Sequence, residues 1–165
     1  MKSSFTLTKL DDINLRRYGV FFKDYKIDIK KILNVMLNMK ELHSSCVFDD
    51  NISKISFDIA FCNDETIREL NKTYRNKDKA TDVITFSLFC DDNNSVICNK
   101  TANLGQIIIS TETADRQKEE NGNDLRKEIL TLLIHGILHL FGFDHLTKKD
   151  YDFVVSIQNK VLKQI

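Results

Sequence analysis

The chain contains no proline and no tryptophan, and only five of its 165 residues are glycine. Turns must therefore rely mainly on asparagine, aspartate and serine, whose side chains hydrogen-bond to nearby backbone. Cysteine is also scarce, and the four cysteines, Cys46, Cys62, Cys90 and Cys98, include no C-x-x-C pair. This spacing argues against a disulfide framework and against a thiolate zinc site. We predict small, reduced core residues at these positions, which is typical of a cytoplasmic protein.

Long apolar runs and an excess of one charge are absent as well. No stretch of 18 or more apolar residues exists, so no membrane span is predicted, and the charges near the N-terminus are not typical of a signal peptide. Basic and acidic residues each number 24, so the formal net charge is zero. Any contact with nucleic acid must therefore come from a local patch. The length and ordinary composition predict one folded domain over residues 1–165.

Hydrophobic periodicity predicts both helices and strands. Apolar residues recur at helical spacing in residues 26–37 and alternate with polar residues in 55–61. A helix that begins after Asn63 or Asp64 has a predicted inner face of Ile67, Leu70 and Tyr74.

The second half of the chain continues this pattern. The predicted elements are strands at 82–89 and 104–110, a polar surface loop at 90–103, and helices at 113–120, at 125–141 and from Thr147, where Asp150 completes a capping box. From Ile129 onward the helix at 125–141 is apolar almost all round, so it is expected to cross the middle of the domain. The order suits an α+β or α/β layered domain, and we adopt α+β, with a small mixed sheet, this central buried helix and further helices packed on the sheet.

Three of the four histidines fall within eleven residues, HGILHLFGFDH, at 135–145. His135 and His139 project from one face of a helix, so two imidazole nitrogens can reach one metal ion at about 2.0–2.1 Å. Gly142 can take the left-handed conformation that ends a helix and lets His145 return to the same ion. Three protein ligands with a fourth position left for water are typical of a catalytic zinc site.

The alternative is a chance arrangement of histidines. Two imidazoles buried side by side without a partner would each leave a polar nitrogen to satisfy, so we favour the metal site. The spacing also matches the zinc-protease pattern H-E-x-x-H-x-x-G-x-x-H, except that Gly136 replaces the glutamate that acts as general base. This glycine disfavours a peptidase and indicates that another element packs closely against the helix.

The motif H-G-x-L-H-L-x-G-x-D-H resembles the signature of the YbeY family, zinc-dependent endoribonucleases involved in bacterial ribosomal RNA maturation. The segments NKTYRNKDKATDVITFS at 71–87 and LGQIIIS at 104–110 are similar to family segments, and the terminal helix with Gln158 also fits. The resemblance covers residues 55–165, while residues 1–50 match only loosely, as a strand and a helix. Gln106 stands where the family usually has aspartate, and Ser87 where it usually has proline.

The resemblance implies that His135, His139 and His145 bind one zinc ion, and that Arg75 is a functional arginine near this metal. Zinc would polarise a phosphate oxygen, activate a water molecule, or do both. Arg75 would neutralise charge that develops on the phosphoryl oxygens, although the residues alone indicate an ordinary surface arginine. A three-histidine site also accepts nickel or iron.

Several other residues receive a structural prediction. Asp144 either orients a ligand imidazole or bonds to its own turn. Glu128 and His43 are predicted to be solvated surface residues, while Tyr74 and Phe89 are predicted to pack in the core rather than to stack on bases. Most surface charges are simply solvated, but the following basic residues are candidates for contact with the RNA backbone: Lys72, Arg75, Lys77, Lys79, Arg116, Lys118, Arg126 and Lys127.

The leading functional hypothesis is a metal-dependent endoribonuclease that acts on single-stranded RNA in rRNA maturation and ribosome quality control. Its expected partners are single-stranded RNA, above all rRNA, and ribosomes or ribosomal proteins, in the cytoplasm and without a membrane. The alternatives are a zinc peptidase and a non-catalytic ribosome-assembly factor with a structural zinc ion. Neither the oligomeric state nor the RNA cleavage site follows from the sequence.

Overall fold

The computed structural model describes residues 1–88, 97, 98 and 100–165. Its centre is a mixed β-sheet with the strand order β1-β2-β5-β3, and β4 pairs with the first part of β5. The strands are β1 (Lys2–Lys9), β2 (Lys54–Cys62), β3 (Val83–Ser87), β4 (Ile97–Cys98) and β5 (Thr101–Ser110). β1, β2 and β5 run parallel, whereas β3 and β4 are antiparallel to β5.

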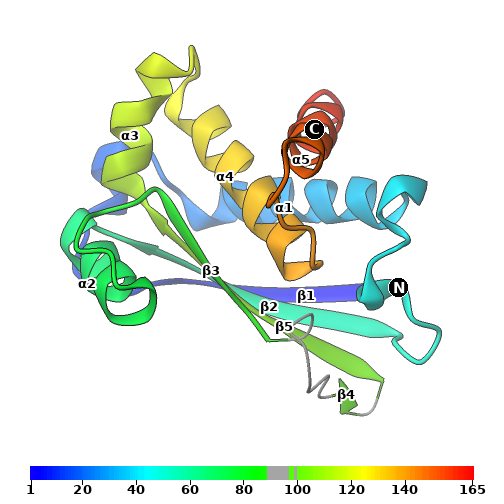
Figure 1. Cartoon of the computed structure of the whole chain (residues 1–165). Coiled ribbons are helices and arrows are strands. Elements are labelled where there is room, and N and C mark those ends of the chain that lie inside the picture. The colour runs from blue at the N-terminus through cyan, green and yellow to red at the C-terminus, as the bar shows by residue number, and fades with distance from the viewer. Residues whose placement is uncertain (89–96, 99) are drawn as a thin grey trace.

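Helices cover the two faces of this sheet unequally. α1 (Phe22–Leu37), α4 (Leu125–Leu140) and α5 (Lys148–Leu162) lie on one face, and α2 (Asp64–Arg75) lies on the other, while α3 (Thr111–Glu120) follows β5 at one end (Figure 1). Short 3-10 turns occupy Leu15–Tyr18, Lys40–Leu42 and Cys46–Phe48. The predicted α+β fold, with a small mixed sheet and a central helix, is therefore confirmed.

Strand periodicity explains how the main core forms. Ile55, Phe57, Ile59 and Phe61 alternate along β2 and are at most 2% exposed, and they pack in one core cluster with α1, α4 and α5. The intervening positions of β2 belong to the opposite face, where Ala60 and Cys62 join a smaller cluster under α2. The sheet face under α2 is therefore covered only at one end.

Helix boundaries follow the capping chemistry of the sequence. The Asn63 side chain accepts a hydrogen bond from the backbone of Thr66 at 2.8 Å and begins α2. Thr147 and Asp150 form the predicted capping box that begins α5. The central helix α4 begins after Asp124, whose carboxylate accepts a hydrogen bond from the Lys127 backbone at 2.7 Å.

The predicted solvated position of Glu128 is wrong. Glu128 is only 2% exposed, because the turn between α3 and α4 folds over its carboxylate. The Asn121 and Asn123 side-chain amides donate hydrogen bonds to this carboxylate at 2.9 and 2.7 Å. A buried charge is tolerated when such donors satisfy it. Glu128 therefore joins the turn to the first part of α4.

Tyr74 also departs from its predicted core position, because its side chain is 64% exposed. Ile67 is buried beneath α2, but the last turn of α2 extends beyond the small core cluster. Tyr74 instead forms a T-shaped pair with Phe86, with ring centroids 5.0 Å apart. Phe89, the other aromatic residue considered for base stacking, lies outside the described residues.

Two further predictions need correction. Cys62 is buried, but Cys46 is exposed on a short 3-10 turn, and the placement of the Cys90 and Cys98 side chains lies outside the described part of the chain. The polar loop predicted at 90–103 is wrong at its end, because β5 begins at Thr101 and β4 precedes it. His43 is exposed, as predicted.

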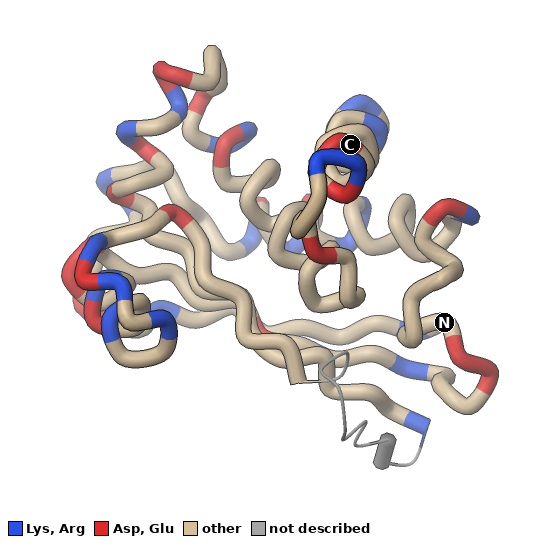
Figure 2. Tube along the Cα trace, viewed as in Figure 1, with Lys and Arg blue, Asp and Glu red and all other residues tan. Residues whose placement is uncertain are grey.

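Charged residues of both signs occur along the helices, and the middle of the sheet carries few (Figure 2). Within the described residues, no helix has the length and apolar character that crossing a membrane requires.

Candidate metal centre

Gly136 allows α4 to pack closely on the sheet. A Cβ atom at this position would lie only 2.8 Å from Cγ2 of Ile107 and 3.0 Å from its Cδ1. Ile107 lies in β5, is fully buried and is β-branched, so its side chain has little freedom to move away. The close packing that the sequence indicated at Gly136 is therefore present. A glutamate could not occupy this position without displacing α4 or β5.

His135 and His139 lie one turn apart on α4 and are both half-buried. Their Nε2 atoms are 3.0 Å apart, and their ring centroids are 4.6 Å apart. Two nitrogen ligands of a tetrahedral zinc ion are separated by about 3.3 Å. The helix thus holds both imidazoles near the separation that a shared metal ion requires.

The end of α4 returns His145 to this pair. Gly142 adopts a left-handed conformation with φ of 83° and donates its backbone N–H to the His139 carbonyl at 2.9 Å. Phe143 donates to the Leu138 carbonyl at 3.0 Å, which closes the helix end. The His145 ring then lies 5.3 and 5.1 Å from the rings of His135 and His139. One ligand atom from each histidine lies within 4.8 Å of the others.

Burial favours the neutral form of the two helix histidines. It lowers the pKa of His135, and the neighbouring His145 lowers it further. Burial also lowers the pKa of His139 to about 4, with further contributions from His135 and His145. A metal ligand must be a neutral imidazole, so both side chains are ready to bind a metal at neutral pH. Together with the ring of His145, they form a group that could hold one metal ion.

Two polar side chains, Asp144 and Gln158, lie beside the cluster. The Asp144 carboxylate accepts a hydrogen bond from the His145 backbone at 2.7 Å, and the same oxygen lies 3.9 Å from Nδ1 of His139. Asp144 therefore bonds to its own turn, whereas 3.9 Å is too long for a hydrogen bond to the nearby imidazole. The nearby imidazole belongs to His139 rather than to the adjacent His145.

Gln158 of α5 supports the cluster from the other side. It is 9% exposed, and its Nε2 donates to the Thr131 carbonyl at 3.4 Å. A hydrogen bond that its side chain accepts from the His135 ring also opposes the lowering of the pKa of His135. Gln158 and His135 line one cavity of about 320 Å³, together with Asp82 and Tyr151. The sequence assigned Gln158 no role, because its contact with His135 joins two separate helices.

Arg75 ends α2 and is exposed. Its positive charge makes a small contribution to the lowered pKa of His139, after burial and the two other histidines. Asn76 follows in a left-handed conformation with φ of 56° and ends the helix. Within the described residues, Arg75 forms no ion pair, so its charge is available to an anionic ligand.

The protein is therefore an α+β domain in which a buried helix and its glycine turn bring three histidines together at one point. Residues 16–165 match the model of the family described as Endoribonuclease YbeY, and the chain belongs to this family. The match therefore begins well before Ile55, which was the first residue covered by the resemblance of the sequence motifs.

Individual relatives support the assignment. The chain is 38% identical over 128 residues to "Endoribonuclease YbeY" of Sulfurihydrogenibium sp., which covers 77% of this chain and 81% of the relative. The protein of the same name from Persephonella marina is 39% identical, over 70% of this chain and 73% of its own. The solution structure of TM1509 from Thermotoga maritima has a TM-score of 0.59, with 22% identity over 98% of this chain and 88% of that chain. This likeness shows the fold.

Proposed function

We propose that this protein is a metal-dependent endoribonuclease that cleaves single-stranded RNA in rRNA maturation and ribosome quality control. The observation that carries the proposal is the convergence of His135, His139 and His145 at one point, with a small contribution of the Arg75 charge to the pKa of His139. The family description supports the reaction, since it names an endoribonuclease. The proposed site of action is the cytoplasm, on rRNA bound to ribosomes or ribosomal proteins.

The three imidazoles would hold one zinc ion, which supplies Lewis acidity and lowers the pKa of water to about 7. The described residues contribute the charge and orientation around this site. Arg75 would bind a phosphoryl oxygen and neutralise the charge that develops there during cleavage. Gln158 would hold the ring of His135 in its ligand orientation, and the Asp144 carboxylate would attract the ring of His139.

A local basic group can attract RNA although the whole chain has no net charge. In Figure 2, several basic positions gather at the end of α2 and in the turn that follows. Arg68 and Lys72 pair with Asp78 at 2.7 and 2.8 Å. Lys77 and Lys79, in contrast, are exposed and form no ion pair among the described residues. Together with Arg75, they can bind the phosphate backbone.

A peptidase is the less favoured hydrolase, for a steric reason. The zinc-protease pattern places the general base at the position of Gly136. Here the Ile107 side chain occupies the space that even a Cβ atom would need. The described chain therefore offers no carboxylate at that point of α4.

The test is cleavage of a labelled single-stranded RNA by protein whose zinc content has been measured. The His139→Ala variant should lose zinc and cleavage, whereas His43→Ala, which changes an exposed histidine outside the cluster, should keep both. Arg75→Ala should keep zinc but lose most cleavage. Circular dichroism would establish that each variant is folded.

The possible results separate the alternatives. A zinc-loaded parent that cleaves no RNA would contradict the nuclease. If it instead cleaves casein and a chelator stops this reaction, the peptidase is supported. A His139→Ala protein that still associates with ribosomes, and has lost only thermal stability, would indicate a structural zinc ion.

A further inference from the structure

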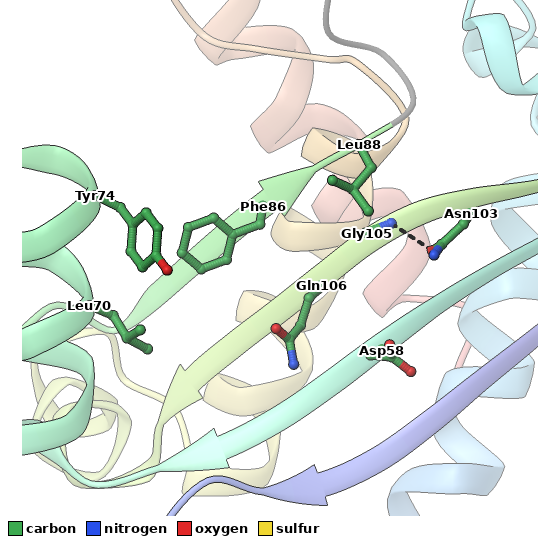
Figure 3. A pocket seen from close by; sticks show the side chains of 8 residues that line it. All are labelled: Asp58, Leu70, Tyr74, Phe86, Leu88, Asn103, Gly105 and Gln106. Carbon is green, nitrogen blue, oxygen red and sulfur yellow. Dashed lines mark hydrogen bonds between the residues drawn. The ribbon is translucent and has the colours of Figure 1, made fainter. Parts of the chain in front are cut away.

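A cavity of about 380 Å³ lies on the sheet face opposite α4. Gln106 and Ile107 are neighbours in β5, so their side chains point to opposite faces of the sheet. Ile107 contacts Gly136 of α4, whereas Gln106 lines the cavity. The cavity lies where α2 ceases to cover the sheet, between the last turn of α2 and strands β2, β3 and β5 (Figure 3).

One wall of this cavity is apolar and aromatic. Tyr74 and Leu88 are 64% and 59% exposed, and Phe86 lies between them on β3. The Tyr74 and Phe86 rings meet edge to face at an interplanar angle of 74°, so one Tyr74 face is not covered by Phe86. An aromatic ring with a free face beside an apolar surface can stack on a flat ligand.

The opposite part of the cavity is polar. Figure 3 shows Asp58 and Gln106 on the same face of the sheet as Tyr74 and Phe86. Asp58 is exposed, accepts a hydrogen bond from the Thr6 hydroxyl, and forms no ion pair among the described residues. Its carboxylate can only accept hydrogen bonds, whereas the Gln106 amide can both donate and accept them. The polar part therefore favours a ligand with N–H donors.

The charged residues near the cavity indicate which other chemical group the ligand carries. No lysine or arginine lines the cavity, but Arg75 directly follows Tyr74, and Lys77 and Lys79 lie in the next turn. These positive charges favour an anionic group beside the Tyr74 end of the cavity over a basic peptide side chain. A nucleotide fits both features, because its phosphate is attracted to the basic residues and its base presents amino groups on a flat ring.

We propose that this cavity binds a nucleobase of single-stranded RNA, which stacks on Tyr74 and directs its amino edge to Asp58. The inference rests on the proposed function, since it supplies a subsite for the RNA that Arg75 would hold. Guanine is the preferred base, because its N1–H and N2–H donors lie side by side and match the two oxygens of a carboxylate. Uracil is the least favoured, because its single N3–H lies between two acceptor oxygens that the carboxylate would repel.

The test uses guanosine, adenosine, cytidine and uridine 5′-monophosphates, which contain no phosphodiester bond to cleave. Each nucleotide is titrated into the isotope-labelled intact protein, and backbone amide shifts are followed by NMR, with ribose 5-phosphate as the probe without a base. We expect shifts around Tyr74, Phe86 and Gln106 with the nucleotides but not with ribose 5-phosphate. Guanosine monophosphate should bind most tightly and uridine monophosphate least.

Three variants test the individual contacts. Tyr74→Ala should weaken guanosine monophosphate binding at least fivefold, the lower limit for loss of one base–aromatic stack. Phe21→Ala removes another exposed aromatic ring, which is 50% exposed and outside this cavity, and should bind like the parent. Asp58→Asn should reduce the preference for guanosine over uridine monophosphate. All three positions are at the surface, so the variants are expected to fold, which thermal unfolding would verify.

Several results would overturn the base site. They are nucleotide shifts confined to residues near the histidine cluster, equal shifts with ribose 5-phosphate, or equal binding by Tyr74→Ala and Phe21→Ala. Binding of an arginine-rich peptide to the cavity, with no nucleotide effect there, would assign it to a protein partner instead. These outcomes are independent of RNA cleavage: a cleaving protein without base binding contradicts the base site alone, and base binding without cleavage contradicts the nuclease alone.

Discussion

Adding one methyl group at Gly136 should destabilise the protein, although alanine is the better helix former. A Cβ atom there would lie 2.8–3.1 Å from three side-chain atoms of Ile107. Overpacking of a core of this kind costs about 1–3 kcal/mol. Replacing an interior helix glycine by alanine contributes about 1 kcal/mol in the opposite direction. We therefore expect Gly136→Ala to lower the free energy of unfolding by about 1 kcal/mol.

The Ile107→Ala background reverses the expected sign. That substitution removes all three contacting atoms and by itself costs about 2–5 kcal/mol through the cavity it leaves. Adding Gly136→Ala in this background should then stabilise the protein by about 1 kcal/mol, because only the helix preference remains. The four proteins form a double-mutant cycle with an expected coupling of about 2 kcal/mol.

Urea denaturation, followed by circular dichroism, measures all four free energies of unfolding. A chelator must be present, because a metal bound only to the folded state would add its own stabilisation. If Gly136→Ala stabilises the parent, or has the same effect in both backgrounds, the contact between α4 and Ile107 is not what restricts residue 136 to glycine.

Two further predictions concern the surroundings of the site and the acid stability. Gln158→Leu should fold but bind zinc about 10–100-fold more weakly, because the hydrogen bond that supports His135 is lost. Titration with a zinc indicator measures this affinity, and an unchanged value would show that Gln158 does not support the site. Burial raises the pKa of Asp64, but hydrogen bonds from Ser110, Thr113 and Arg116 outweigh burial and lower it below 3.8. The stabilisation from this carboxylate is therefore complete above the pKa of 3.8 that the group has in the unfolded chain. It is lost as the pH falls through the lower pKa of the folded protein. Asp64→Asn should lower the free energy of unfolding by about 1 kcal/mol at pH 7 and by less below pH 3.8. Urea denaturation measures this difference, and an equal decrease at both pH values would contradict this explanation.

Short-range patterns in the sequence determined the histidine arrangement. The four-residue spacing of His135 and His139 places them on one helix face, and Gly142 supplies the left-handed residue that returns His145. The capping box at Thr147 likewise involves residues only three positions apart. Such features are predictable because the interacting groups are fixed by local backbone geometry.

Contacts between distant segments were decided only by the tertiary structure. The sequence indicated close packing at Gly136, but only the fold identifies Ile107 as the partner. Glu128 reads as a solvated residue until the turn before α4 folds over it. Tyr74 has the periodicity of a buried residue, yet it is exposed because α2 extends beyond its core cluster. Periodicity shows which face of an element is apolar, whereas the extent of its burial depends on which other elements cover that face.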